Sequence, residues 1–307
     1  MIQIRNILCP IDFSEYSRRA LDHAVAIARW YDSAITVLHV YSSTPIAAYA
    51  PGSPVLESTA LTPADIEQLT AHTRRFVDAA DVGDIPVEVV IVEGNIAAEI
   101  LSRARQTGLL VIGTHGRSGF DRLVLGSLTE NMLRKAACPV LTVPRAAPGT
   151  APGSAVLFKR ILCPIDFSDV STNALNYAMS VAQEADAHLT VLHVMTYEME
   201  LTPDMSESLL AYSHLNKEEF RQACEDNSRE LLKAAVPDTV RAYCTVETLL
   251  ATGKPYREIL RVAAEQRSDL IVMGVQGRGA VDLMFFGSTT QHVVRQATCP
   301  VLTLRKS

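Results

Sequence analysis

Hydrophobic residues fall along the chain in short apolar runs that alternate with stretches of helical spacing. The first run, residues 7–11, is typical of a strand buried on both faces. Ser14 can then cap a helix whose apolar positions recur every three or four residues, at Ala20, Leu21, Ala24, Val25 and Ala28. Further strands are expected at 35–40, 87–92, 109–112 and 140–143, with helices near 64–80, 97–106 and 128–136. This alternation predicts an α/β fold with a parallel sheet, right-handed crossovers and helices on both faces.

The same pattern occurs twice. Residues 7–14 (ILCPIDFS) return unchanged at 161–168, and residues 36–40 (TVLHV) return at 190–194, in both cases 154 residues later. The segment CPVLT at 138–142 returns at 299–303, so seven residues are added to the second copy somewhere after His193. A Pro/Gly/Ala stretch between the copies is typical of a linker. We therefore expect a first domain at 1–145, a linker at 146–155 and a second domain at 156–307.

Composition narrows the class of protein. The 307 residues are 48% hydrophobic and 20% charged, as in a globular protein with a real core. The net charge of −6 argues against nucleic acid as a partner, and no apolar run is long enough to predict a membrane span. The first residues lack a basic and then apolar leader, so a cytoplasmic location is expected. Cys9, Cys138, Cys163 and Cys299 stand in apolar runs beside prolines and are interpreted as buried small hydrophobes.

The candidate chemistry lies where strands end. In open α/β sheets, ligands bind beyond the carboxyl ends of the strands, at the point where strand order reverses. The first strand ends at Asp12, whose carboxylate can accept hydrogen bonds from a ribose or a base. The fourth strand runs into Gly113 and Gly116, and nine residues later Gly126-Ser127 stands where a helix begins. Glycines let backbone N–H groups approach anionic oxygens, and a helix start adds donors, so this pattern indicates a phosphate site that Ser127 would also cap.

The second copy repeats these features after an apolar strand at 270–273. It carries Asp166, then Gly274 and Gly277, and nine residues later Gly287-Ser288. The repetition favours a ligand role, although the glycines could serve only in turns and Asp12 could serve only the following helix. His39 and His193 end strands beside apolar residues and are interpreted as packed or hydrogen-bonded core histidines. One difference stands out, because His115 of the first copy is Gln276 in the second, and only the histidine can change charge near neutral pH.

On these residues the chain resembles a tandem form of the universal stress protein (UspA) family, in its ATP-binding branch. The resemblance covers both copies from ILCPID to CPVLT and includes the spacing G-x2-G-x9-G-[ST]. It implies two Rossmann-like domains of the adenine nucleotide alpha-hydrolase-like type, each with a five-stranded parallel sheet in the order 3-2-1-4-5. It also implies two ATP sites, with Mg²⁺ held mainly by the phosphates, and the last strands, 139–143 and 300–304, pairing the domains as an intramolecular pseudo-dimer.

The resemblance also assigns residues to the two sites. In the first copy, adenine and ribose would contact Pro10, Ile11, Asp12 and Val40. Ribose and phosphates would be surrounded by Ile112, Gly113, His115, Gly116, Gly126, Ser127, Leu128 and Thr129. In the second copy the matching residues are Pro164, Ile165, Asp166, Val194, Met273, Gly274, Gln276, Gly277, Gly287, Ser288, Thr289 and Thr290.

The function expected from this reading is a nucleotide-dependent stress-response protein that binds ATP and acts through a protein partner not yet known. The common phosphate-loop, dinucleotide, hydrolase and metalloprotease motifs are absent. One alternative is a slow ATPase in which His115 orients a water molecule. The other is an interaction module with non-functional glycine loops, whose partners dock on the long segments 41–61 and 195–215. Further dimerisation is left open.

Overall fold

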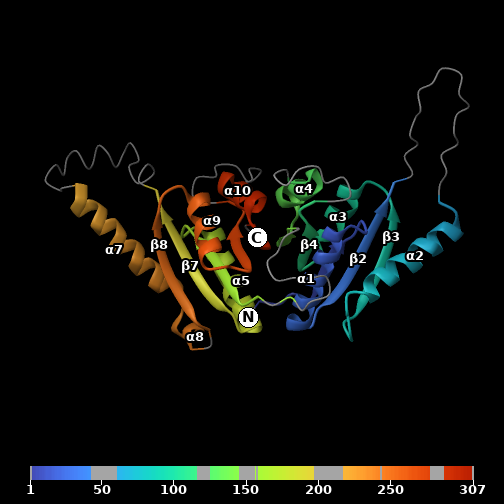
Figure 1. The fold of residues 1–307 in the computed structure, drawn as a ribbon, viewed down its shortest axis with the longest axis horizontal. Coiled ribbons are helices and arrows are strands. Elements are labelled where there is room, and N and C mark those ends of the chain that lie inside the picture. The colour runs from blue at the N-terminus through green and yellow to red at the C-terminus, as the bar shows by residue number, and fades with distance from the viewer. Residues whose placement is uncertain are drawn as a thin grey trace, which may run out of the picture. The chain divides into compact units, whose positions relative to one another are not determined.

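The computed structural model describes residues 2–42, 61–115, 125–144, 156, 158–196, 217–242, 244–276 and 287–305. The chain divides into two compact units, made mainly of Gln3–Arg145 and Leu157–Ser307 (Figure 1). The predicted linker at 146–155, and most of the long segments 41–61 and 195–215, lie outside the described residues.

The N-terminal unit alternates strands and helices as the sequence predicts. Its elements are β1 (Asn6–Pro10), α1 (Glu15–Tyr31), β2 (Ala34–Tyr41), α2 (Pro63–Asp78), β3 (Val87–Glu93), α3 (Ile96–Ala104), β4 (Leu109–Gly113), α4 (Ser127–Lys135) and β5 (Val140–Val143). The strands pair in parallel in the order β3-β2-β1-β4-β5. The order reverses between β1 and β4, so the carboxyl ends of these two strands flank the expected ligand edge.

The C-terminal unit repeats this topology. Its elements are β6 (Arg160–Ile165), α5 (Asp169–Ala185), β7 (His188–Met195), α7 (Lys217–Ala235), α8 (Asp238–Arg241), β8 (Val246–Thr252), α9 (Pro255–Glu265), β9 (Leu270–Gly274), α10 (Ser288–Gln296) and β10 (Val301–Leu304). These strands are also parallel and follow the order β8-β7-β6-β9-β10. The predicted strand order of 3-2-1-4-5 is therefore confirmed in both copies.

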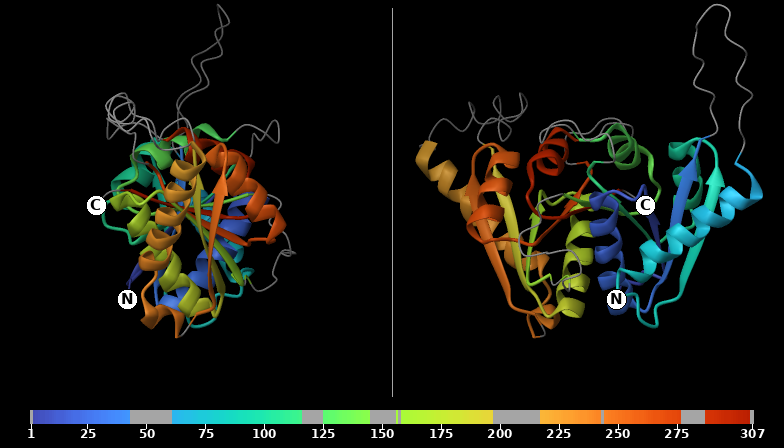
Figure 2. Two further views of the ribbon diagram at one scale, coloured as in Figure 1. Left: turned by 90° about the vertical axis from the view of Figure 1, so that its left-hand side faces the viewer. Right: turned by 45° about the vertical axis from the view of Figure 1, so that its right-hand side comes forward.

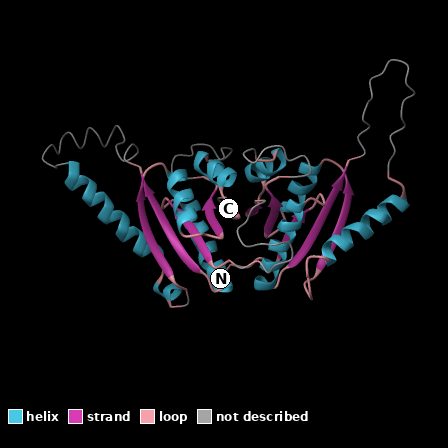
Figure 3. Ribbon diagram, in the orientation of Figure 1, coloured by secondary structure: helices cyan, strands magenta, loops and turns pink. Residues whose placement is uncertain are grey.

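Helices cover both faces of each sheet (Figure 3). In the N-terminal unit α1 packs on β1 and β4, whereas α3 packs on β2 and against α4. In the C-terminal unit α7 packs on β8, and Figure 2 shows α9 on the opposite face of that sheet. Right-handed crossovers produce this division, because the direction of strand addition reverses after the third strand. Strands covered on both faces need apolar residues on both, which explains why β4 and β5 are buried throughout.

The helix that follows each first strand begins and ends as its residues require. Ser14 is the N-cap of α1 and accepts a hydrogen bond from the Ser17 N–H, and Ser168 caps α5 in the same way. Both helices end at an aspartate in the left-handed region, Asp32 and Asp186, each with φ of 50°. Aspartate tolerates this conformation better than most residues, and the chain can then turn directly into the next strand.

The seven added residues of the second copy lie in two places. Matching strands are 154 residues apart from β2 to β7, 159 from β3 to β8 and 161 from β4 to β9. Five residues are therefore added between β7 and β8, the connection that contains α7 and the short α8. The other two are added between β8 and β9, where α9 has 11 residues and α3 has nine. The insertions leave the site-forming strands β6 and β9 untouched.

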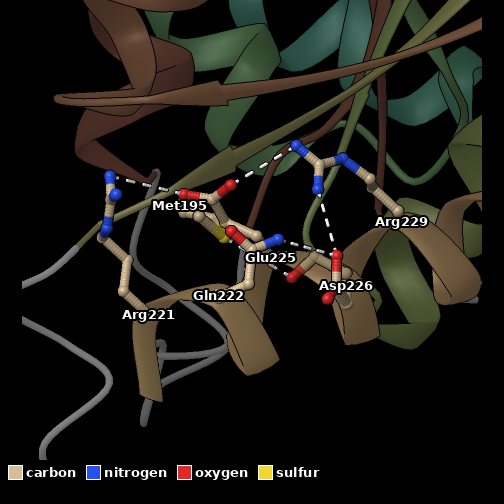
Figure 4. A network of polar contacts seen from close by, with 7 residues as sticks. Met195, Arg221, Gln222, Glu225, Asp226 and Arg229 are labelled. Atoms are coloured by element: carbon tan, nitrogen blue, oxygen red, sulfur yellow. Dashed lines mark hydrogen bonds and ion pairs between the residues drawn. The ribbon is translucent and has the colours of Figure 1, made fainter. Parts of the chain in front are cut away.

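The outer side of α7 carries a network of ion pairs (Figure 4). Arg229 pairs with Glu225 at 3.3 Å and with Asp226 at 3.2 Å, and Arg221 lies 3.7 Å from Glu225. The Gln222 amide adds a hydrogen bond of 3.0 Å to Asp226. Exposed pairs of this kind contribute only about 0.3–0.5 kcal/mol each, so they support a helix whose stability comes mainly from packing.

Four cysteines in or just before strands lie in the core. Cys9, Cys138, Cys163 and Cys299 are all buried, and none forms a disulfide. Burial raises the pKa of Cys9 and Cys299 to about 12 and that of Cys138 to about 11, because an apolar surrounding disfavours the thiolate. The interpretation of these residues as buried hydrophobes is confirmed. Over the described ranges, no helix combines the length and apolar character that a membrane crossing requires.

Candidate functional site

The aspartate at the end of the first strand organises the turn into the helix. In the N-terminal unit, Asp12 Oδ1 accepts hydrogen bonds from the Ser14 N–H at 3.0 Å and from Ser14 Oγ at 2.5 Å. The matching Asp166 Oδ1 accepts from the Ser168 N–H at 3.1 Å and from Ser168 Oγ at 2.6 Å. Each carboxylate therefore holds the serine that caps the next helix. Asp12 therefore does serve the helix that follows it, as the sequence allowed, and its contact with a ligand stays a prediction.

The turn itself has an unusual backbone. Phe13 and Phe167 stand in the left-handed region, with φ of 63° and 62°, which costs free energy for a bulky residue. The Phe13 ring packs on His39, with the two ring centres 4.7 Å apart, and His39 Nδ1–H donates to the Ile11 carbonyl at 2.9 Å. His193 makes the matching bond to Ile165 at 2.8 Å. Both histidines are hydrogen-bonded at strand ends, as predicted, and they hold the strained turn in place.

The glycine motif closes on itself through backbone and threonine contacts. In the N-terminal unit, the Gly126 N–H donates to the Thr114 carbonyl at 2.9 Å, and Thr129 Oγ1 donates to the Gly113 carbonyl at 2.8 Å. These bonds bring the start of α4 against the end of β4. The predicted residues on the two sides of the loop therefore do meet.

The C-terminal unit builds the same arrangement from its own residues. The Gly287 N–H donates to the Val275 carbonyl at 3.0 Å, and Thr290 Oγ1 donates to the Gly274 carbonyl at 2.9 Å. The start of α10 therefore lies against the end of β9, as α4 lies against β4. Two copies with different neighbouring side chains produce one backbone geometry.

The helix start at this place lacks a side-chain cap. Gly126 is the N-cap of α4, and Gly287 is the N-cap of α10, so neither helix start has a capping side chain. By contrast α1, α2, α3 and α5 are each capped by a serine, threonine or asparagine, whereas α8 and α9 have Pro237 and Lys254 at the N-cap and also lack a side-chain cap. The expectation that Ser127 caps α4 is wrong: Ser127 is the first helical residue and is exposed, as is Ser288. The helix-start N–H groups are therefore left for water or a ligand.

The first glycine of each motif is required for packing. A Cβ at Gly113 would lie 2.8 Å from Tyr16 Cβ on α1, and a Cβ at Gly274 would lie 2.8 Å from Val170 Cγ1 on α5. Both distances are shorter than real Cβ contacts. These glycines let the first turn of α1 or α5 approach the end of the fourth strand, which brings the aspartate turn and the glycine loop together. Backbone approach to an anion is therefore not needed to explain these two positions.

His115 has one satisfied nitrogen and one that is not. Its Nδ1 lies 3.0 Å from Thr114 Oγ1, and its ring centre is 5.3 Å from that of Tyr16. Among the residues that the structure describes, its Nε2 is buried and has no hydrogen-bond partner. A buried polar nitrogen left unpaired is costly, so this atom is a place where a ligand group would add stability. The C-terminal unit has Gln276 and Val275 at the matching positions, which removes both the imidazole and the hydroxyl.

Most of the predicted site residues lie at the ligand edge of their unit. The strand ends Ile11, Ile112, Pro164, Ile165 and Met273 are buried, and Val40 is buried with 9% of its surface exposed, so these could offer mainly backbone groups. Gly116 and Gly277 lie outside the described residues. Thr129 and Thr290 are buried, and Gly113 is buried against α1. The other predicted residues are half-buried or exposed: Pro10, Asp12, His115, Gly126, Ser127, Leu128, Asp166, Val194, Gly274, Gln276, Gly287, Ser288 and Thr289.

Two residues that shape the N-terminal site were not foreseen. Tyr16 covers Gly113 and contacts His115, and Thr114 holds the imidazole through its hydroxyl. The signal was present in the duplication, because Tyr16, Thr114 and His115 are all replaced in the second copy, by Val170, Val275 and Gln276. Because these three side chains contact one another in the first copy and are all replaced in the second, they form a group that changed together.

The fold defines each unit as a Rossmann-like α/β domain whose open edge lies at the reversal of strand order. The sequence model of the Universal stress protein family matches residues 3–144 and again residues 157–305. The chain belongs to the universal stress protein family and carries two copies of its domain.

Known proteins of this family resemble the chain over its whole length. A universal stress protein of Mycolicibacterium smegmatis is 25% identical over 302 residues, which cover 97% of this chain and 96% of that protein. The crystal structure of a universal stress protein from Archaeoglobus fulgidus superposes with a TM-score of 0.69 at 23% identity, covering 100% of both chains. A universal stress protein solved in complex with cAMP is 24% identical, with a TM-score of 0.34, over 47% of this chain and 98% of that one.

Proposed function

We propose that each unit binds an adenine nucleotide, with ATP as the expected ligand, and that the protein acts as a nucleotide-dependent stress-response protein. The observation that carries this proposal is the uncapped helix start at Gly126 and Gly287, held against the end of the fourth strand in both units. Unsatisfied N–H groups and the positive end of the helix dipole favour a phosphate there. The family-model matches support the domain limits 1–145 and 156–307 as part of the same proposal.

Within each site, different residues would contact different parts of the nucleotide. The N–H groups at the start of α4 or α10, with Ser127 or Ser288 beside them, would receive the phosphates. Asp12 or Asp166, at the end of the first strand, would face the ribose or base. His115 Nε2 would supply one further hydrogen bond in the N-terminal site alone, because Gln276 replaces it in the other. The two sites are therefore expected to differ in affinity for the phosphates.

The metal would come with the nucleotide. Among the described residues no group of three or more His, Cys, Asp or Glu side chains is arranged to hold an ion. In this proposal Mg²⁺ would be coordinated mainly by phosphate oxygens and water, as Mg²⁺ commonly is in nucleotide sites.

The alternative to binding alone is a slow ATPase in which His115 orients the attacking water. Phosphate release by the wild type and by His115→Gln, measured with excess Mg-ATP, separates the two functions. A slow ATPase would lose its rate in the variant, whereas a binder would show no rate in either protein.

The first experiment is to denature the purified full chain and to identify and count the released nucleotide by chromatography and mass spectrometry. Titrations with Mg-ATP, ADP, AMP and cAMP then follow by calorimetry. About two nucleotides per chain would support both sites, whereas no released nucleotide and no titration signal would contradict the proposal and favour an interaction module.

Ser127→Glu and Ser288→Glu locate the phosphates. A glutamate at the first helical position favours the helix dipole, so the fold is preserved, but its charge opposes a phosphate anion. Each variant is expected to weaken ATP binding at one site by about tenfold or more, with the other site unchanged. Ile96→Glu is the matched control, because Ile96 is the exposed first residue of α3, a helix start that Asn95 already caps. Equal ATP binding by Ser127→Glu and wild type would place the phosphates elsewhere.

The pairing of the two domains through their last strands remains a prediction from the family resemblance, and the cytoplasmic location remains a prediction from the sequence.

A further inference from the structure

The two units differ systematically on one surface, formed where the helix after the third strand packs on the helix after the fourth. In the C-terminal unit this is the contact of α9 with α10, and in the N-terminal unit it is the contact of α3 with α4. Counting from the glycine that directly follows the third strand of each copy, Gly94 or Gly253, gives the matching positions on α3 and α9. The duplication thus supplies an internal reference for what the fold alone requires here.

Four replacements on this surface add positive charge or aromatic surface to the C-terminal unit, whereas Arg103 and Lys135 of the first copy become Val262 and Gln296. Asn95, Ala97, Ala98 and Asn131 of the first copy are replaced, in that order, by Lys254, Tyr256, Arg257 and His292. Arg134 is paired with Glu130 at 2.8 Å, but the matching Arg295 has Gln291 in place of the glutamate. We call Lys254, Tyr256, Arg257, His292 and Arg295 the α9–α10 patch.

The α9–α10 patch is a continuous, ordered surface. The rings of Tyr256 and His292 stack with centres 4.3 Å apart at 24°, which joins the first turn of α9 to α10. Arg257 Nε donates to Tyr256 Oη at 3.1 Å, and its guanidinium carbon lies 5.8 Å from the ring centre. His292 Nδ1–H donates to the Ser288 carbonyl at 2.7 Å, so its rotamer is fixed. Arg295 follows His292 by three residues and shares its helix face.

The charge on this surface is not neutralised. Lys254, Arg257, His292 and Arg295 are exposed. Across the described part of the chain, no ion pair involves the lysine or either of the two arginines. The nearby Arg261 provides the contrast, because it pairs with both Glu258 and Glu265 at 2.7 Å. Within the described residues, a protein with a net charge of −6 thus keeps three unpaired cations, Lys254, Arg257 and Arg295, on the surface that includes the half-buried Tyr256.

We propose that the α9–α10 patch docks a carboxylate-rich segment of a partner protein, and that the N-terminal unit lacks this surface. Fixed arginine and tyrosine side chains are typical of interface residues that contribute most to binding, and the cations provide charge complementarity for acidic side chains. Nucleic acid is the less suitable partner, because recognition of bases uses free aromatic faces and Tyr256 is already stacked on His292. This proposal does not depend on nucleotide binding, although Ser288 links the patch to the predicted phosphate site.

The test uses the full chain and a fluorescein-labelled peptide of ten glutamates, followed by fluorescence anisotropy at low ionic strength. One variant gives the patch the residues of the N-terminal unit: Lys254→Asn, Tyr256→Ala, Arg257→Ala and His292→Asn. Asn95 caps α3 through its side chain and Lys254 does not cap α9, so the first change adds a cap and the variant should fold. The expected result is a loss of peptide affinity of about tenfold or more.

A charge-matched control separates the patch from net charge. Lys233→Asn with Arg241→Ala removes two exposed cations from α7 and α8 of the same unit, and peptide binding should stay as in the wild type. In reverse, Ala97→Tyr, Ala98→Arg and Asn131→His should restore peptide binding to the four-residue patch variant through the N-terminal unit.

Several results would overturn the proposal. These are no binding of the peptide by the wild type, equal binding by the patch variant, or an equal loss in the control. A ten-residue thymidine oligonucleotide that binds through the same residues at least about tenfold more tightly than the peptide would assign the patch to nucleic acid instead. Running each titration with and without Mg-ATP keeps this outcome separate from the proposed nucleotide function.

Discussion

A buried histidine makes the N-terminal unit sensitive to acid. His23 lies on α1 with 2% of its surface exposed, and its Nδ1–H donates to the Arg19 carbonyl at 2.7 Å. Burial lowers the pKa of His23 to about 4, from an ordinary value of 6.5, because the charged imidazolium would lose its hydration. The matching residue of the C-terminal unit is Tyr177, which does not titrate in this range.

The sign follows from proton linkage. Between pH 6.5 and 4 the unfolded chain binds a proton at His23 that the folded unit excludes, so the free energy of unfolding falls as the pH falls. With these two pKa values, lowering the pH from 7.5 to 5.0 removes about 2 kcal/mol of stability from the N-terminal unit. That is a large part of the roughly 5–15 kcal/mol that stabilises a typical domain.

The only tryptophan provides a local probe for this loss. Trp30 lies near the end of α1, in the same unit as His23, so its fluorescence during urea unfolding of the full chain reports on this unit. His23→Gln keeps a donor at this place and cannot be charged. The fall in unfolding free energy between pH 7.5 and 5.0 should be about 2 kcal/mol smaller in this variant than in the wild type.

Comparing the two proteins cancels the contribution of all other titrating groups, including Asp22, whose half-buried carboxyl has a raised pKa through burial. A difference between wild type and variant below about 0.5 kcal/mol would refute the reasoning, because it would mean that the folded unit protonates His23 as readily as the unfolded chain does.

The remaining predictions concern packing and thiol chemistry. Gly274→Ala should destabilise the C-terminal unit by about 1–3 kcal/mol, and Val170→Ala should recover most of that loss, because the clash is with Val170 Cγ1. Gly113→Ala should destabilise the N-terminal unit by a similar amount, but Tyr16→Ala should not recover that loss, because the clash is with the Cβ that alanine keeps. Denaturant unfolding of the single and double variants measures the unfolding free energies of both pairs. Recovery of stability in both units, or in neither, would contradict this account. Cys224 is half-buried whereas the other cysteines are buried, so one thiol per native chain should react rapidly with a disulfide reagent and Cys224→Ser should remove that reaction. Two or more rapid thiols would show that at least one of the buried cysteines is accessible.

The sequence was sufficient for the fold because each local signal agrees with the global topology. The apolar runs are short and continuous where strands are covered on both faces, and the Ser14 and Ser168 caps stand directly before the predicted helices. Duplication strengthened these signals, since a chance pattern would not recur with the same order and spacing. Helix bounds were one or two residues off at most ends, because terminal turns depend on caps that a periodic pattern does not contain.

The site was less predictable, for reasons that involve contacts distant in sequence. The clash that requires a glycine at position 113 is with Tyr16, almost a hundred residues earlier, and no local pattern reveals it. The same holds for the buried Nε2 of His115, whose lack of a partner is a property of the packed structure. The error over Ser127 was local: Gly-Ser at a helix start was interpreted with serine as the cap, but the glycine occupies that position and its carbonyl accepts the Glu130 N–H.

The two units show how one backbone can carry different chemistry. Gly126 and Gly287, together with the threonines three residues later, make the same hydrogen bonds, so the shape of the loop does not depend on the side chains around it. Side chains could therefore diverge without loss of the fold. The N-terminal unit has the Thr114–His115 pair directly after β4, whereas the C-terminal unit has Arg257 against Tyr256 and, within the described residues, no ion pair to that arginine. Because the residues around His115 and those of the α9–α10 patch belong to different units, we expect variants at the two places to act separately. His115→Gln should alter nucleotide affinity and leave peptide binding unchanged. The patch variant should weaken peptide binding and leave nucleotide affinity unchanged.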